Sequence, residues 1–180
     1  MKLNIREILS SGLEVELPVD LGSLNSRFEG ELSVSKKRNS PKVLFFEAET
    51  KLKFSLSGQI IEMDGQSFGR FKTTCSRCLD EAICKVNCEN KHLFKPVGER
   101  GSDEFNDETG ISYYSDDEIE FREIIEESLV LNMPFSVFCR SDCKGLCLDC
   151  GENLNISICE CSKKKGSDER MAVFRDLKIQ

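Results

Sequence analysis

Six of the ten cysteines lie in one stretch, Cys139-Arg-Ser-Asp-Cys143-Lys-Gly-Leu-Cys147-Leu-Asp-Cys150-Gly-Glu-Asn-Leu-Asn-Ile-Ser-Ile-Cys159-Glu-Cys161. Cys147 and Cys150 have the C-x2-C spacing of a zinc knuckle, and the glycine that follows allows a tight turn around two thiolates. The stretch has too few apolar residues to fold as a core of its own. We therefore expect bound metal to hold it together.

A disulfide framework is the other interpretation of such dense cysteines, and it requires an oxidising compartment. The N-terminus begins with alternating charge and has no apolar run followed by small residues, so it does not resemble a secretory signal. No window approaches the ~18 consecutive apolar residues of a membrane span, and the mean hydropathy is −0.34. We expect a cytoplasmic protein with no membrane partner.

The net charge of −7 is unevenly distributed along the chain. Residues 101–127 contain 11 acidic residues and 1 basic residue, whereas residues 1–100 contain 14 acidic and 16 basic ones. A run of acidic residues is ordinarily a solvated connection, so we expect a loop over residues 101–117. The acidity of this segment does not exclude an RNA partner for the rest of the chain, although no long basic stripe indicates one.

The first hundred residues have the alternating apolar and polar pattern of short antiparallel strands. The segments with this pattern are residues 13–17, 28–34, 43–48, 54–61, 67–74 and 82–94. Met63-Asp64-Gly65 contains the Asp-Gly hairpin signal, so we expect a turn there. In the last strand Cys84, Cys88 and His92 share the apolar face, which places them in the core.

Helical patterns occur only later in the chain. We expect a helix over residues 118–132, capped by Asp117, with an apolar stripe that ends before Pro134. The stripe consists of Phe121, Ile124, Ile125 and Leu129. A shorter helix is expected after Asp168, with Met171, Phe174 and Leu177 on one side.

These elements predict an α+β fold with two parts. Residues 1–138 form a mainly antiparallel, barrel-like β-domain with one packed helix. Residues 139–180 form a cysteine-rich zinc-knuckle segment that ends in the short helix and docks on the first part.

A second C-x2-C pair, Cys75 and Cys78, lies at a turn between two expected strands. Two thiolates alone do not hold a structural zinc ion, so this pair needs further ligands. Counting close pairs gives two sets of four ligands: Cys147, Cys150, Cys159 and Cys161 in one, and Cys75, Cys78, Cys139 and Cys143 in the other. Two alternatives remain open: a single zinc ion bound by four of the six C-terminal cysteines, with Cys75 and Cys78 as a redox dithiol, or an iron–sulfur cluster.

Catalytic constellations are scarce in this sequence. The single histidine, His92, lies on the face expected to be buried, and neither a dinucleotide-binding nor a Walker A motif is present. We therefore expect a binding or assembly protein without a small-molecule substrate; the alternative is a dithiol oxidoreductase that uses Cys75 and Cys78. The basic residues nearest the cysteine pairs are candidate phosphate contacts for RNA: Arg77, Lys144, Lys163, Lys164 and Lys165.

Several of these motifs occur together in a known family. They are Cys75-x-Arg-Cys78-Leu, Cys143-Lys-Gly-Leu-Cys147-x-x-Cys150-Gly-x-Asn-Leu-Asn155, Cys159-x-Cys161 and Asp168-x-Arg170. In this order the chain resembles the YceD family of large ribosomal RNA subunit accumulation proteins, over essentially its whole length. Leu148 departs from the pattern, because family members often carry proline there, but the knuckle spacing is unchanged.

The resemblance implies a role in the production or stability of large-subunit ribosomal RNA, and hence in ribosome assembly, with no established enzymatic activity. The expected partner is ribosomal RNA or a large-subunit ribosomal protein. Since family members vary in their cysteines, the expectation of one or two zinc ions rests on the residues of this chain.

Overall fold

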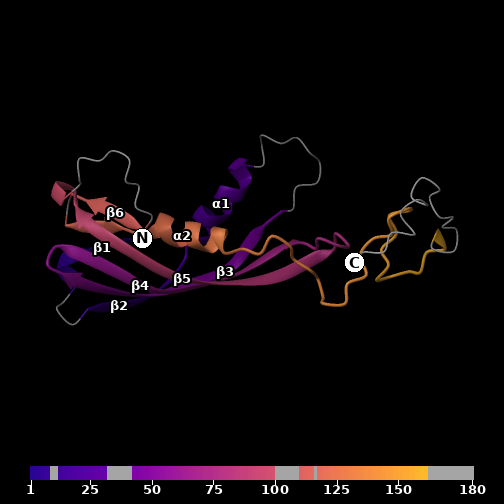
Figure 1. Cartoon of the computed structure of the whole chain (residues 1–180), viewed down its shortest axis with the longest axis horizontal. Coiled ribbons are helices and arrows are strands. Elements are labelled where there is room, and N and C mark those ends of the chain that lie inside the picture. Colours follow the sequence, from indigo (N-terminus) through magenta and orange to yellow (C-terminus); the bar gives the residue numbers. More distant parts are fainter. Residues whose placement is uncertain (9–11, 32–41, 100–109, 116, 162–180) are drawn as a thin grey trace, which may run out of the picture.

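The computed structural model describes residues 1–8, 12–31, 42–99, 110–115 and 117–161 (Figure 1). Several sequence predictions fall outside these ranges. They concern most of the acidic loop, Lys163, Lys164 and Lys165, and the helix expected after Asp168. None of the helices in the described part of the chain has the length and hydropathy of a transmembrane segment.

The main sheet has five strands in the order β2-β3-β4-β5-β6. Their bounds are Leu13–Pro18 (β2), Leu44–Ser57 (β3), Ile60–Thr74 (β4), Glu81–Pro96 (β5) and Ile111–Tyr114 (β6). Neighbouring strands are antiparallel, except that β5 and β6 are parallel. A separate two-stranded sheet pairs β1 (Lys2–Asn4) with β7 (Glu118–Glu120).

The helices are α1 (Leu21–Glu31) and α2 (Arg122–Leu131), with short 3-10 turns η1 (Ile5–Glu7) and η2 (Val97–Glu99). Helices and a mainly antiparallel sheet confirm the α+β class. The described strands form an open sheet with β2 and β6 at its edges, so the barrel-like description was too specific. The strand β6 also lies within residues 101–117, where we expected only a loop.

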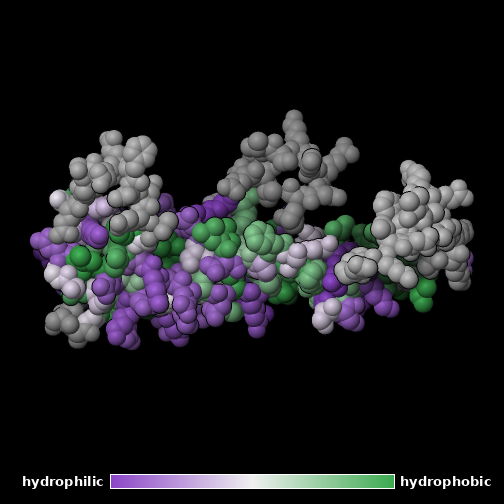
Figure 2. All heavy atoms as spheres, in the orientation of Figure 1, coloured by the Kyte–Doolittle hydropathy of each residue, from purple (hydrophilic) through white to green (hydrophobic). Residues whose placement is uncertain are grey.

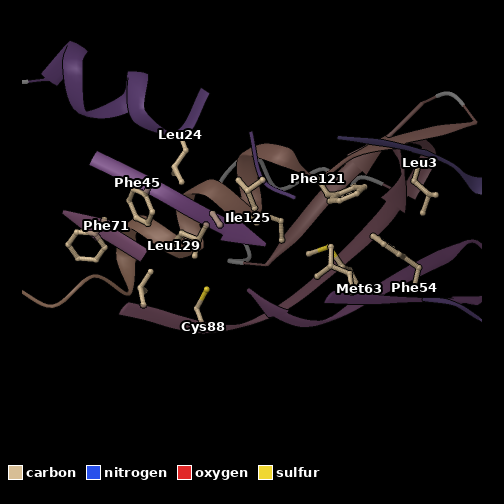
Figure 3. Packing of buried hydrophobic residues seen from close by; sticks show 14 of the residues in the cluster. Leu3, Leu24, Phe45, Phe54, Met63, Phe71, Cys88, Phe121, Ile125 and Leu129 are labelled. Carbon is tan, nitrogen blue, oxygen red and sulfur yellow. The ribbon is translucent and has the colours of Figure 1, made fainter. Parts of the chain in front are cut away.

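One face of the sheet is buried beneath α2, which packs on β4 and β5. Burial alternates along the long strands, because successive side chains point to opposite faces. In Figure 3 Ile125 and Leu129 of α2 lie among the buried side chains of the sheet, and Leu24 points toward them from α1. The apolar stripe predicted for α2 is thereby confirmed.

The opposite face of the sheet carries charged side chains in cross-strand pairs. Glu16 and Glu14 of β2 pair with Lys51 and Lys53 of β3, at 2.9 Å and 3.7 Å between nitrogen and oxygen. Figure 2 shows hydrophilic residues gathered on the side of the molecule where Figure 1 places β2 and β4. The sheet therefore has one apolar and one polar face.

The strand predicted over residues 28–34 is wrong for its described part, because residues 28–31 belong to α1. The Asp20 side chain accepts hydrogen bonds from the backbone N–H groups of Gly22 and Ser23, which satisfies the free donors at the start of this helix. Leu24 and Phe28 are four residues apart and share one face of this helix. Leu24 is buried, and the ring of Phe28 stacks on that of Phe45. Asp20 was the N-terminal signal that the alternation argument overlooked.

The hairpin predicted at Met63-Asp64-Gly65 is also wrong. The turn between β3 and β4 lies at residues 58–59, where Gly58 has a φ of 64°. Gly65 instead lies within β4, and a Cβ there would collide with the backbone carbonyl of Lys51 on β3. Glycine at this position permits close approach of two strands, which the Asp-Gly rule does not distinguish from a turn.

The second helix begins later than predicted, at Arg122, because residues 118–120 pair with β1. Asp117 does not cap it. Its carboxylate accepts a hydrogen bond from Arg6, and its carbonyl accepts one from the backbone N–H of Ile5. Residues 118–120, which local propensity assigned to the first turn of the helix, thus form a strand that pairs with β1.

The long strand β5 agrees with its predicted faces. Cys88 is buried, whereas Cys84 and His92 are half-buried. The Nε2 atom of His92 lies 2.8 Å from the Ser112 hydroxyl, and burial lowers the pKa of the imidazole. His92 is therefore held in a polar contact at the margin of the core.

Candidate metal centres

Eight cysteines lie beyond one end of the long strands. Cys75 and Cys78 are in the turn between β4 and β5, and the chain that follows α2 passes this turn at the right of Figure 1. The backbone N–H of Ser76 donates to the Val137 carbonyl at 2.8 Å, and the N–H of Val137 donates to the Ser76 hydroxyl at 3.2 Å. These bonds bring Cys139 and Cys143 to the turn from far along the sequence.

The eight sulfurs fall into two groups of four. The first group is Cys75, Cys78, Cys139 and Cys143, and the second group is Cys147, Cys150, Cys159 and Cys161. Within each group all Sγ atoms lie within 4.8 Å of one another. The structure thus brings together the same two sets of four that the count of close pairs suggested, and each set is compatible with a metal ion.

The first group has the dimensions of a tetrahedral thiolate site. The Sγ atoms of Cys75 and Cys143 are 3.8 Å apart, and those of Cys78 and Cys139 are 3.5 Å apart. Zinc–sulfur bonds of about 2.3 Å imply tetrahedral edges of about 3.8 Å. All of these cysteines are free thiols, so the short distances are not disulfide bonds.

The same turn encloses the first two cysteines of each group. The N–H of Leu79 donates to the Cys75 carbonyl at 3.0 Å, and the N–H of Gly151 donates to the Cys147 carbonyl at 2.9 Å. Both donors follow the second cysteine of a C-x2-C pair, with φ values of 64° and 74°. Leucine rarely adopts this left-handed conformation, so the first turn stores backbone strain that the glycine of the second avoids.

Hydrogen bonds at the sulfurs divide the thiols into more and less acidic ones. Burial alone acts to raise the pKa of Cys75, but backbone hydrogen bonds from Cys78, Arg77 and Cys139 outweigh it and lower this pKa to about 6. A backbone hydrogen bond from Cys150 is the largest of the effects that lower the pKa of Cys147 to about 7. One member of each C-x2-C pair is therefore readily ionised, as a metal ligand must be.

Cys78, Cys139, Cys159 and Cys161 shift in the other direction. Burial raises the pKa of Cys78, and the hydrogen bond with Cys150 is the main cause that raises the pKa of Cys161 to about 12. In the absence of a cation, ionisation of one thiol thus opposes ionisation of its neighbours. A divalent cation removes this opposition because it neutralises the clustered thiolates.

The two groups differ in burial. In the first group Cys75, Cys78 and Cys143 are 0%, 3% and 4% exposed and Cys139 lies at the surface, whereas in the second group Cys150 lies at the surface and the other three are half-buried. Beside the second group is a groove of about 680 Å³, bordered by Leu146, Leu154 and Ile158 among others. The first group therefore joins the cysteine-rich segment to the sheet, and the second closes the outer end of that segment.

The candidate RNA contacts that the structure describes occupy different settings. Arg77 is engaged within the protein: its Nη1 donates to the Cys143 carbonyl at 3.0 Å, and its guanidinium lies 4.3 Å from the centre of the Phe138 ring. Lys144 is exposed at the edge of the groove. Both residues are exposed, but the Arg77 side chain also holds the first group.

Asn153 and Asn155 were not among the predicted site residues. The Nδ2 of Asn155 donates to the Cys143 sulfur at 3.3 Å, and Asn153 donates to the Asp80 carboxylate at 2.8 Å. The Asn-Leu-Asn string could have indicated them, but the sequence analysis used this string only as part of the family motif.

Comparison with known proteins finds a matching family and several similar proteins. A family model described as "Large ribosomal RNA subunit accumulation protein YceD" matches residues 63–178. Uncharacterized proteins of Mycobacterium tuberculosis and Mycobacterium bovis are 34% identical over 77 residues, which is 43% of this chain and 37% of theirs. A Mycobacterium leprae protein is 31% identical over 81 residues, 44% of this chain and 36% of its own.

The matched part thus spans little more than a third of the length of these curated relatives. No solved structure matches the chain. The family match, in contrast, covers β5, α2 and both cysteine groups. The chain belongs to the YceD family of large ribosomal RNA subunit accumulation proteins.

Proposed function

We propose that this protein is a non-enzymatic factor for the accumulation of large-subunit ribosomal RNA, and that zinc bound by both cysteine groups stabilises it. The observation that carries the proposal is the assembly of eight cysteines into two compact groups of four within a chain that belongs to this family.

The donor set favours zinc. Four thiolates in a tetrahedron fill the coordination sphere of Zn²⁺ and leave no position for water or substrate, so such a site stabilises structure and performs no chemistry. The distances within the first group fit this geometry. Of residues 139–161 only Cys143 and Gly145 are buried, so the metal supplies stability that burial does not.

The dithiol oxidoreductase is the less favoured function. A redox C-x2-C pair needs one exposed, ionised thiol, and the lowered pKa of Cys75 alone would suit it. However, Cys75 is 0% exposed and its sulfur lies against that of Cys143. A disulfide substrate would have to displace this packing to reach it.

The proposed partner is large-subunit ribosomal RNA or a ribosomal protein bound to it. Support comes from the family description and from the exposed Lys144 beside the groove. Crosslinking in cells followed by sequencing of bound RNA identifies the site of contact on the partner.

Deletion of the gene tests the proposal. We expect mature large-subunit ribosomal RNA to fall relative to small-subunit RNA, and the wild-type chain to restore the ratio. A variant with Cys75→Ser and Cys78→Ser should restore it poorly because the first group holds the cysteine segment on the sheet. Normal ratios in the deletion strain, together with disulfide reduction that depends on Cys75, would support the oxidoreductase instead.

A further inference from the structure

The two cysteine groups are joined by a very short connection. Only Lys144, Gly145 and Leu146 separate Cys143 of the first group from Cys147 of the second. The N–H of Leu146 donates to the Arg77 carbonyl at 3.0 Å, and the Gly145 carbonyl accepts from the N–H of Leu154 at 2.9 Å. The connection is therefore held on one side by the first C-x2-C turn and on the other by residues 153–155.

Asn155 reaches back from the loop of the second group to a sulfur of the first. Its Oδ1 accepts from the backbone N–H of Lys144 at 2.8 Å. Because a backbone N–H can only donate, this contact fixes the amide orientation, and Nδ2 must face the Cys143 sulfur 3.3 Å away. The amide thus donates to a group that becomes a thiolate when metal binds.

Asn153 holds Asn155 in this position. Its Oδ1 accepts from both the backbone N–H and the Nδ2 of Asn155, at 3.0 Å and 2.9 Å. Its own Nδ2 donates to the carboxylate of Asp80, which lies two residues after Cys78. Every polar atom of the two amides is therefore hydrogen-bonded, and the bonds to Lys144, Cys143 and Asp80 connect the second loop with the first group.

We propose that Asn153 and Asn155 couple the two groups, so that metal binding by the second group raises the metal affinity of the first. Both asparagines lie between Cys150 and Cys159, in the loop that the second group closes. Closure of that loop by metal orders the two amides, and the donor to Cys143 stabilises its thiolate. This inference rests on the metal binding assigned in the proposed function.

Cobalt titration of the full chain tests the coupling, because Co²⁺–thiolate absorption reports each filled site. Substitution of Cys159 and Cys161 by serine removes the second group. We expect the affinity of the first group for Co²⁺ to fall about 10–100-fold, the usual effect of losing an outer-shell partner. Independent filling of the first group with unchanged affinity would overturn the proposal.

Asn155→Asp removes the Nδ2 donor to Cys143, together with its hydrogen bond to Asn153. The carboxylate still accepts from the N–H of Lys144 but offers no N–H to Cys143, so we expect a similar 10–100-fold fall with the second group intact. This variant removes no sulfur, so it keeps the test valid if the double cysteine variant fails to fold. If Asn155 only caps Lys144, Asn155→Asp will bind Co²⁺ like the wild type and the proposal fails.

Ser157→Ala is the matched control, because it removes a hydrogen bond to Glu152 in the same loop without a contact to sulfur. We expect it to bind Co²⁺ as the wild type does. In the background that lacks Cys159 and Cys161, adding Asn155→Asp should change the affinity by less than about twofold. Full additivity of the two changes would contradict the coupling.

The outcomes also separate this inference from the proposed function. A wild-type chain that binds two Co²⁺ ions with affinities insensitive to Asn155 overturns the coupling alone. A wild-type chain that binds none overturns both.

Discussion

The sheet and the cysteine segment, residues 139–161, reach a defined structure by different means. The sheet buries large aromatic side chains such as Phe54, Phe71 and Phe94. The cysteine segment leaves Leu148 and Ile158 each 93% exposed, so its apolar residues form no core. We infer that packing stabilises the first region and sulfur ligation the second, and that the second cysteine group can be lost while the sheet persists.

The largest effect is expected from loss of the second cysteine group. Cys147→Ser removes a ligand, and metal binding and local folding are one equilibrium worth about 10–16 kcal/mol in small zinc domains. The zinc content should fall and amide exchange should accelerate over residues 144–161, while the far-UV circular dichroism of the sheet persists. Unchanged exchange in this segment would mean that packing holds it after all.

A smaller effect, confined to the sheet, is expected from Phe54→Ala. Phe54 is fully buried, and its ring centre lies 5.2 Å from that of Phe121. Truncation of such a side chain costs about 3–5 kcal/mol of the free energy of unfolding, measured by urea denaturation. The zinc content of the folded protein should not change, and a loss of zinc would show that the two regions are not independent.

Cys88→Ala is the matched control for Cys147→Ser, since both remove one sulfur. Cys88 belongs to the core of the sheet and its sulfur donates to the Ser67 carbonyl at 3.6 Å. We expect a loss of about 1–2 kcal/mol in the free energy of unfolding. Zinc measured by elemental analysis should remain at the wild-type level; equal loss in both variants would contradict the distinction between core and ligand cysteines.

The smallest effect has the opposite sign and tests the strained turn. Leu79 is 57% exposed with a positive φ, so its side chain contributes little burial while its backbone is strained. Leu79→Gly should raise the free energy of unfolding by about 0.5–1 kcal/mol, after the entropy that glycine adds to the unfolded chain. Leu79→Ala keeps the strain and should not stabilise; a gain of equal size in that variant would refute this cause.

Sequence patterns were most reliable where one strong signal acts alone. The faces of β5 and the apolar stripe of α2 follow from simple periodicity, and the structure agrees with both. Cysteine spacing likewise suggested two sets of four, although spacing carries no information about the distance between sulfurs. That distance depends on the bonds between Ser76 and Val137, which join segments far apart in the sequence.

The errors arose where local signals compete with distant contacts. Asp64-Gly65 is a turn signal, yet Gly65 is required within β4 because the Lys51 backbone approaches it closely. Residues 118–120 can begin a helix, yet they pair with the N-terminal strand. The roles of Asn153 and Asn155 depend on side-chain geometry across two loops, which periodicity and spacing do not describe.

The zinc content of the purified protein tests the central claim most directly. Protein prepared in reducing buffer, without exposure to chelator, should contain two zinc ions per chain by elemental analysis, one for each cysteine group. Less than about half an ion per chain, or the brown absorption of an iron–sulfur cluster, would contradict the account.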